Sequence, residues 1–251
     1  MQKYKKKSTF ANKKQKKSDI YLHISIFFCI FAEKSYNLKI IDMNTTEKFV
    51  ITINRELGSG GRTVGRKLAE KLGVAFYDKA LIHALQERYN LSTEQIERLK
   101  GHEQGWWAEF KRKMTLSDSE YNLNQTGIET IDIFRSEVEI LRAIANEESC
   151  VLAGRTGFYI FSEHPNHLSI FIQASMPNRV ERVAREQNMS QREARATIDK
   201  IDQMRENYVR EYAHTSRYDS RNYQLVLSMD GLSEDAAVDM IINYINNTNK
   251  H

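Results

Sequence analysis

Short apolar runs rich in β-branched residues recur along the chain, separated by longer segments of helical period. Each run has the length and composition of a buried strand. The strands are expected at residues 49–54, 74–77, 150–153, 168–172 and 223–227. Apolar residues three and four positions apart predict amphipathic helices at 63–72, 79–89, 131–146 and 233–246, with one more from Pro177 onward. Strands that alternate with helices indicate a parallel sheet covered on both faces, so we expect an α/β fold.

Local signals mark the start of two further helices. Ser190, followed three residues later by Glu193, forms a capping box that opens a long charged helix. Ser92 and Gln95 form a second box of the same kind. Residues 101–130 lose the helical period and are mostly polar, so we interpret them as a mobile insertion.

The first 42 residues differ in composition from the rest of the chain, because they contain no Gly, Pro, Arg, Val or Trp. We interpret residues 1–42 as upstream sequence translated by mistake and Met43 as the true start. A signal peptide is one alternative, because a lysine run precedes the apolar residues 20–31, but no suitable cleavage site follows. A membrane anchor is another, but this run is shorter than the about 20 residues that span a bilayer.

Charge and cysteine content exclude several classes of function. Residues 1–19 hold eight lysines against one aspartate, so the remainder is mildly acidic although the whole chain carries +4. An acidic domain lacks the basic surface of a nucleic-acid-binding protein. Two cysteines cannot build a disulfide framework, which favours a reducing, cytoplasmic location. Neither C-x-x-C nor H-E-x-x-H occurs, so no metal site made by side chains is expected.

A glycine-rich turn, R-E-L-G-S-G-G-R-T at residues 55–63, lies between the first expected strand and the first expected helix. Backbone N–H groups of such a turn and of the helix N-terminus converge where a phosphate can bind. Glycine is needed where a side chain would block the phosphate or a positive φ. A connection that binds nothing is the alternative. The residues predicted to bind nucleotide are Gly58, Ser59, Gly60, Gly61, Arg62 and Thr63.

The turn departs from the usual phosphate-loop pattern G-x-x-x-x-G-K-[ST]. Gly60 is in place, but Arg55 replaces the first glycine and Gly61 replaces the lysine. That lysine normally reaches the β- and γ-phosphates, so another cation is required. We expect Arg62 or Arg66 to supply it, because a guanidinium binds phosphate with two hydrogen bonds.

Arginines also occur in two later segments. Arg155 follows the strand expected at 150–153, within V-L-A-G-R-T-G-F-Y-I-F. Asp202 and Arg205 form a D-x-x-R pair on the long charged helix, and a solvated helix face is the alternative reading of that region. Three arginines at steps of three are expected on one helix face, namely Arg179, Arg182 and Arg185.

Together, these segments resemble the cytidylate-kinase-like family of P-loop nucleoside monophosphate kinases over about residues 49–245. Glycine at the lysine position of the loop is typical of that family. The chain departs from the family at two positions, with Thr156 in place of an aspartate and Ile198 in place of an arginine. The resemblance implies a P-loop NTPase three-layer sandwich with a parallel sheet, a helical acceptor-binding insertion and a helical lid. The implied kinase domain covers residues 43–251, with the insertion at about 79–130 and the lid at about 179–210.

The resemblance also implies roles for particular residues. Arg155 is expected to grip the acceptor nucleotide together with Asp78, for which a helix N-cap is nearly as good an explanation. Phosphoryl transfer needs charge neutralisation and alignment, and arginines from several segments suit that need. The residues expected to act in catalysis are Arg62, Arg155, Arg182, Arg185, Asp202 and Arg205.

The expected reaction is transfer of a phosphoryl group from ATP, with Mg²⁺, to a nucleoside monophosphate, most simply CMP or dCMP. A P-loop kinase for another small acceptor is one alternative, and a nucleotide-binding protein without catalysis is another. Small-molecule nucleotides are the expected partners, with no nucleic acid and no membrane. The sequence does not indicate the oligomeric state.

Overall fold

The computed structural model describes residues 43–78 and 131–248. The interpretations of residues 1–42, of the helix at 79–89, of the capping box at Ser92 and of the insertion at 101–130 lie outside the described residues. They stay predictions.

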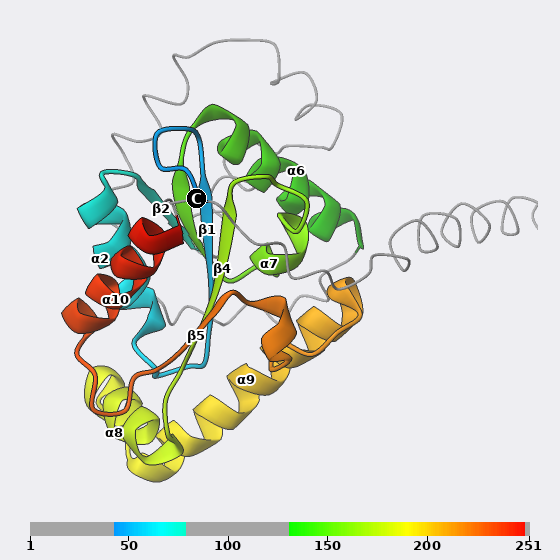
Figure 1. Cartoon of the computed structure of the whole chain (residues 1–251). Helices are drawn as coiled ribbons and strands as arrows, with labels where there is room; N and C mark the ends of the chain where they lie inside the picture. Colours follow the sequence, from blue (N-terminus) through cyan, green and yellow to red (C-terminus); the bar gives the residue numbers. More distant parts are fainter. Residues whose placement is uncertain (1–42, 79–130, 249–251) are drawn as a thin grey trace, which may run out of the picture. The chain divides into compact units, whose positions relative to one another are not determined.

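Five parallel strands form one sheet in the described part of the chain, in the order β2-β3-β1-β4-β5 (Figure 1). Val50 in the central strand lies opposite Cys150 on one side and His167 on the other. The strand order switches at β1, because the strands that follow it are added first on one side and then on the other. In open parallel sheets, ligands bind at the carboxyl ends of the strands beside such a switch point. The strands are β1 (Val50–Arg55), β2 (Ala75–Asp78), β3 (Cys150–Ala153), β4 (His167–Gln173) and β5 (Leu225–Ser228).

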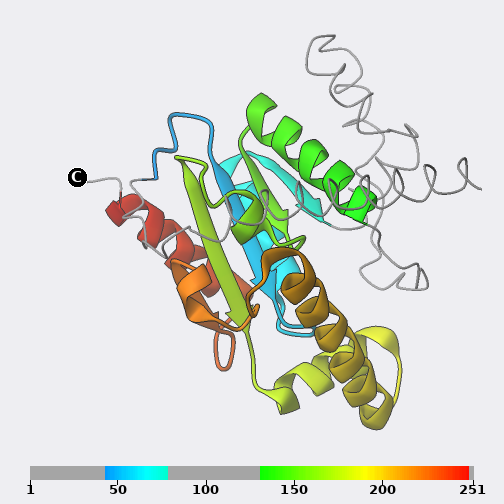
Figure 2. The same cartoon turned by 90° about the vertical axis from the view of Figure 1, so that its right-hand side faces the viewer.

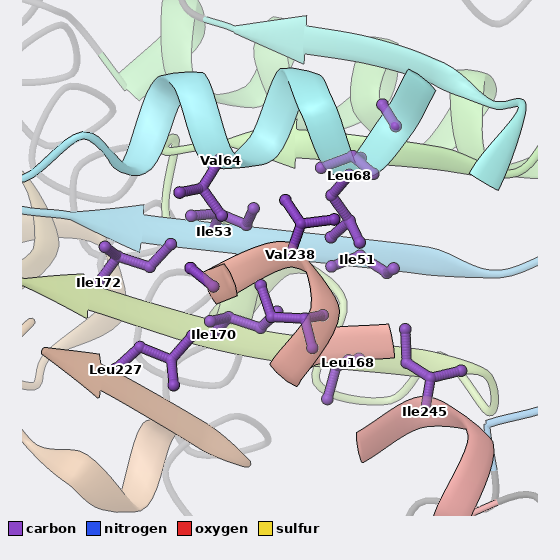
Figure 3. Packing of buried hydrophobic residues seen from close by; sticks show 14 of the residues in the cluster. Ile51, Ile53, Val64, Leu68, Leu168, Ile170, Ile172, Leu227, Val238 and Ile245 are labelled. Carbon is purple, nitrogen blue, oxygen red and sulfur yellow. The ribbon is translucent and has the colours of Figure 1, made fainter. Parts of the chain in front are cut away.

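Helices cover both faces of the sheet, which confirms the expected three-layer arrangement (Figures 1 and 2). On one face, α2 (Gly61–Leu72) and α10 (Glu234–Thr248) pack on Ile51, Ile53 and Ile170 in the largest apolar cluster (Figure 3). On the other face, α6 (Ile131–Glu147) and α7 (Gly157–Ile160) pack on Val50 and Leu152. Burial of these side chains is the main favourable contribution to folding, at about 25 cal/mol per Å² of apolar surface.

A pair of helices lies beyond the carboxyl ends of β1 and β4: α8 (Met176–Gln187) and α9 (Gln191–Ala213) (Figures 1 and 2). The expected capping box at the start of α9 is confirmed, because the Ser190 side chain accepts from the Glu193 N–H and the Glu193 side chain accepts from the Ser190 N–H. The two helices share a small apolar cluster that includes Leu57 of the glycine turn, Val183 and Ile198. Their packing therefore holds α8 and α9 against the glycine turn.

Several elements differ in their bounds from those expected. Helix α2 begins at Gly61 rather than Thr63, so Gly61 and Arg62 belong to its first turn. Strand β5 begins at Leu225 rather than residue 223, because a 3₁₀ turn, η1 (Ser220–Asn222), precedes it. The short helix α7 was not predicted, because one turn is too short to show a period. In the described ranges, no helix has both the length and the apolar composition needed to cross a bilayer.

Candidate active site

The glycine turn forms a bare backbone cradle at the N-terminus of α2. Gly58 and Gly60 have φ of 79° and 83°, the left-handed region that favours glycine. Gly60 caps α2, and its carbonyl accepts from the Val64 N–H at 3.0 Å. The buried Ser59 hydroxyl donates to the Glu56 carbonyl at 2.9 Å and accepts from the Gly61 N–H at 3.4 Å. These contacts fix the turn at a helix N-terminus, the kind of place where backbone N–H groups can bind an anion.

The guanidinium of Arg182 lies directly over this cradle. A Cβ placed on Gly60 would stand 2.0 Å from Nη1 of Arg182, so a side chain there would displace this guanidinium, and the φ of 83° would strain it as well. The same guanidinium forms an ion pair with Glu234 at the start of α10. The side chains of Arg182 and Glu234 are 24% and 25% exposed, so both are accessible to a ligand. Hydrogen bonding to Arg182 lowers the pKa of Glu234 below its usual value of 4.5.

An open pocket of about 240 Å³ lies beside the cradle. Gly58 and Ser59 form its floor, and the exposed Arg185 lines it together with Arg182. The connection between β5 and α10 closes another side with Met229, Leu232 and Glu234. The pocket therefore combines the backbone of the glycine turn and two arginines with apolar side chains.

A second arginine of α8, Arg179, is buried and serves a different purpose. Its Nε donates to the Leu57 carbonyl at 2.8 Å, and its Nη1 lies 3.2 Å from Glu56. Its Nη2 binds the carboxylate of Asp202 on α9. Arg179 thus ties the glycine turn to both helices.

Asp202 is the centre of a buried ionic network. Its carboxylate accepts from the Leu57 N–H at 3.1 Å and lies 3.3 Å from Nη1 of Arg217 and 3.6 Å from Nη1 of Arg205. Arg205 also donates to the Arg55 carbonyl at 3.2 Å, and Arg217 donates to the same carbonyl. The expected D-x-x-R pair therefore does meet at the end of β1, where it fixes the start of the glycine turn.

Two of the expected site residues bind each other at the end of β2. Nε and Nη2 of Arg62 each lie 2.8 Å from Oδ2 of Asp78, and both side chains are 11% exposed. Thr63 and Arg66, one and four residues further along α2, are exposed. The charge of Arg62 is thus largely balanced by Asp78 in this state.

Arg155 lies in a strained segment after β3. Gly154, Arg155 and Thr156 all have positive φ, at 90°, 56° and 51°. A non-glycine residue in this region costs about 1–3 kcal/mol, and such strain concentrates at functional sites. The Arg155 guanidinium lies 2.6 Å from Glu137 of α6 and 5.7 Å from the ring centre of Tyr208. The ends of β2 and β3 therefore hold two arginine–carboxylate pairs, Arg62–Asp78 and Arg155–Glu137.

The expectation that three arginines of α8 share one face is wrong. Arg179 points into the buried network, Arg182 covers the cradle and Arg185 is exposed at the pocket. Each step of three residues falls about 60° short of a full turn, so two steps rotate the side chain by about 120°.

The two departures from the family pattern have structural explanations. Ile198 is 0% exposed and belongs to the apolar cluster that packs α8 and α9 against Leu57 of the glycine turn, so it fills a packing position. The neighbouring Asp199 forms an exposed pair with Arg195. Thr156 caps α7, and its hydroxyl donates to the Arg155 carbonyl at 2.6 Å.

Four residues of the site were not expected: Glu56, Glu137, Arg217 and Glu234. Glu234 opens the last helix and Glu56 lies inside the loop motif, so both were near recognised signals. Glu137 and Arg217 become part of the site only through tertiary contacts. In the described ranges, no cluster of three His, Cys, Asp or Glu side chains is arranged to hold a metal ion.

A glycine cradle at the carboxyl end of a central parallel strand, ringed by arginines, defines the protein as a P-loop kinase. The chain belongs to the cytidylate kinase-like family, whose model matches residues 50–231. This confirms the resemblance noted from the sequence.

Similar proteins agree with this assignment. A cytidylate kinase of Sulfolobus acidocaldarius is 22% identical over 203 residues, which are 80% of this chain and 96% of that protein. The crystal structure of an uncharacterized protein from Eubacterium ventriosum superposes with a TM-score of 0.59 at 27% identity, covering 79% of this chain and 98% of that one. A shikimate kinase from Bacteroides thetaiotaomicron, with a TM-score of 0.42 and 14% identity, is too distant to inform the site.

Proposed function

We propose that the protein transfers the γ-phosphoryl group of ATP to CMP or dCMP, giving the nucleoside diphosphate and ADP. The observation that carries the proposal is the guanidinium of Arg182 held over the bare backbone of Gly60. A cation above converging N–H groups is the arrangement that the β- and γ-phosphates of a nucleotide require. The family membership supports the choice of a cytosine nucleotide as the acceptor.

The donor nucleotide fits the pocket beside the cradle. Its phosphates lie over Gly58–Gly61, where Arg182 exchanges its bond to Glu234 for bonds to phosphate oxygens. Its base lies against Met229 and Leu232 on the connection between β5 and α10. Arg185, on the open side of the pocket, adds a further positive charge.

The acceptor lies at the opposite edge, beyond β2 and β3. Arg155 binds its phosphate there, and Asp78 and Arg62 lie at the end of the neighbouring strand. Arg205, held at the end of β1, approaches the phosphoryl group when α8 and α9 close as a lid. In this proposal the donor and acceptor nucleotides bind on opposite sides of β1.

Mg²⁺ enters this site bound to the phosphates of ATP. A magnesium ion takes one or two carboxylates and fills its remaining positions with phosphates and water. Glu56, inside the loop, places one carboxylate near the cradle, where Oε1 lies 3.2 Å from Nη1 of Arg179 and Oε2 accepts from the Ala174 N–H at 3.2 Å. When bound, the ion neutralises charge on the β- and γ-phosphates.

The test is a coupled assay of the purified protein with ATP and each nucleoside monophosphate in turn. We expect the highest kcat/KM with CMP or dCMP. We expect loss of turnover in Gly60→Val, whose side chain would displace the Arg182 guanidinium from the cradle. If the protein phosphorylates a different small acceptor instead, the proposed acceptor is wrong and the proposed phosphoryl transfer stands. Tight ATP binding without any phosphorylated product would contradict the proposed catalysis.

A further inference from the structure

Relative to the usual phosphate loop, the cation and a glycine have exchanged places in this chain. The usual pattern begins with glycine and ends with G-K, whereas here Arg55 begins the loop and Gly61 stands at the lysine position. A Cβ placed on Gly61 would lie 2.6 Å from Cβ and 3.2 Å from Cγ of Arg55. The stem of Arg55 therefore fills the space that a side chain at position 61 needs, and the two replacements depend on each other.

The other end of the Arg55 side chain reaches the acceptor segment. A Cβ placed on Gly154 would lie 2.6 Å from Nη1 of Arg55. Gly154 directly follows β3 and immediately precedes Arg155. The side chain thus starts beside the glycine cradle and carries its charge to the strained turn after the neighbouring strand.

Arg55 is buried, and its backbone is held in place at the end of β1. The residue is 9% exposed, and its carbonyl accepts hydrogen bonds from both Arg205 and Arg217. A charge held in place before the reaction needs no reorganisation during it, which is the basis of electrostatic catalysis.

The other arginines near the loop are placed less well for a role between the two nucleotides. Arg62 is bound to Asp78 at the end of β2, and Arg66 is exposed. Arg182 covers the cradle from the side of Glu234. Arg55 lies on the line from the cradle to Gly154.

We propose that Arg55 is a catalytic residue whose guanidinium replaces the phosphate-loop lysine and contacts the phosphoryl group in transit. The inference rests on the proposed phosphoryl transfer. In that step, the bond from the γ-phosphorus to the bridging oxygen breaks, a bond to an acceptor phosphate oxygen forms, and ADP leaves with the electron pair. Arg55 transfers no proton; it stabilises the charge on the transferring oxygens.

The first test compares Arg55→Met with Arg55→Lys. Methionine keeps an apolar stem beside Gly61 and removes the charge. Lysine keeps the apolar stem and also the positive charge. We expect Arg55→Met to lower kcat by about 100-fold or more, with the ATP Kd changed by less than about threefold. Arg55→Lys is expected to retain at least about tenfold more activity than Arg55→Met. Equal loss in the two variants would assign Arg55 a packing role and overturn the proposal.

The second test exchanges the two residues. Gly61→Lys alone should be inactive, because its side chain meets the stem of Arg55. In Arg55→Gly combined with Gly61→Lys, the clash with the Arg55 stem is gone and only Ile172, whose Cβ lies 3.2 Å from the new Cβ, must give slightly. We expect kcat to rise at least about tenfold above that of Arg55→Gly alone. A folded double variant no more active than Arg55→Gly would contradict the exchange.

The same Arg55 and Gly61 variants are also assayed for slow hydrolysis of ATP, in which water is the acceptor of the phosphoryl group. If the unmodified protein phosphorylates no nucleoside monophosphate, the proposed acceptor is wrong, and the water reaction still decides the role of Arg55. Loss of this reaction in Arg55→Met, with its partial return in the double variant, supports the proposal independently.

Discussion

The arginines around the glycine cradle form two groups that differ in burial and in partners. Arg179 and Arg217 are 4% and 2% exposed, and both donate to backbone carbonyls of the loop and to Asp202. Arg182 and Arg185 belong to the same helix as Arg179, yet they line the pocket and stay accessible. We call the first pair the anchoring arginines and the second pair the pocket arginines.

This difference shows how one residue type performs two tasks within a short distance. A buried guanidinium must be balanced by fixed partners, so it becomes part of the frame. A partly exposed guanidinium such as that of Arg182, whose partners Glu186 and Glu234 are themselves partly exposed, can exchange these partners for a ligand. The predictions below test this division from the largest expected effect to the smallest.

Asp202→Asn should produce the largest loss of stability, because it removes the negative charge that balances the anchoring arginines. Breaking a buried ion pair by changing one partner costs about 3–5 kcal/mol of unfolding free energy. Urea unfolding measures this loss. Asp199→Asn, three residues earlier on α9, is the matched control, because its exposed pair with Arg195 contributes only about 0–1 kcal/mol. Equal losses in the two variants would refute the anchoring role.

Arg205→Ala tests a residue that lies between the two groups, because its side chain is 26% exposed and contacts both Asp202 and the Arg55 carbonyl. If α8 and α9 act as a lid, Arg205 meets the phosphoryl group chiefly in the transition state. We then expect kcat to fall about 100-fold while both Michaelis constants change little. Steady-state kinetics and a melting curve are the measurements. A folded variant with unchanged kcat would place Arg205 with the anchoring arginines.

Arg182→Ala should weaken ATP binding with little effect on stability. Loss of one charge-assisted contact is worth about 1.5–3 kcal/mol, which corresponds to an increase in the ATP Kd of about tenfold or more. Isothermal titration calorimetry measures the change. Arg192→Ala, at an exposed position in the first turn of α9, serves as the control and should bind ATP normally. Normal ATP binding by Arg182→Ala would remove it from the pocket arginines.

The smallest effect concerns the pH dependence of the Arg182–Glu234 pair. The pKa of Glu234 is lowered in the folded protein, so its contribution to stability is present above pH 4.5 and is lost as the pH falls through the folded pKa. We expect this group to contribute less than about 1 kcal/mol, because the pair is partly exposed. NMR titration should show the Glu234 pKa rising toward 4.5 in Arg182→Ala. A pKa unchanged by that substitution would show that Arg182 is not its cause.

The strands could be predicted closely from the sequence, because a buried parallel strand is a short β-branched run. Strand β3 has the expected bounds, and β1 differs by one residue at each end. Strand β5 was extended too far toward its start, because Tyr223 is buried for another reason. Its ring packs on Phe158 and Phe171, and its hydroxyl donates to the Arg217 carbonyl.

The site was harder to predict than the sheet. The glycine cradle is a continuous segment, so its composition and flanking elements indicate it directly. The partners of Arg155 and Asp202 come from distant segments: Glu137 lies on α6 and Arg217 lies in the loop after α9. Neither has a periodic or motif signal, and only the folded chain brings them to the loop.

The central position of β1 has a consequence for synthesis of the protein. Val50 is made early, but its neighbours Cys150 and His167 follow much later, and Arg217 later still. Sheets paired over such sequence separations fold slowly, because the loop-closure entropy precedes the gain from contacts. While the ribosome is still adding these segments, the apolar side chains of β1 have no strand beside them. The emerging chain is therefore most prone to aggregation before β4 is complete, and the glycine cradle acquires its shape among the last parts of the fold.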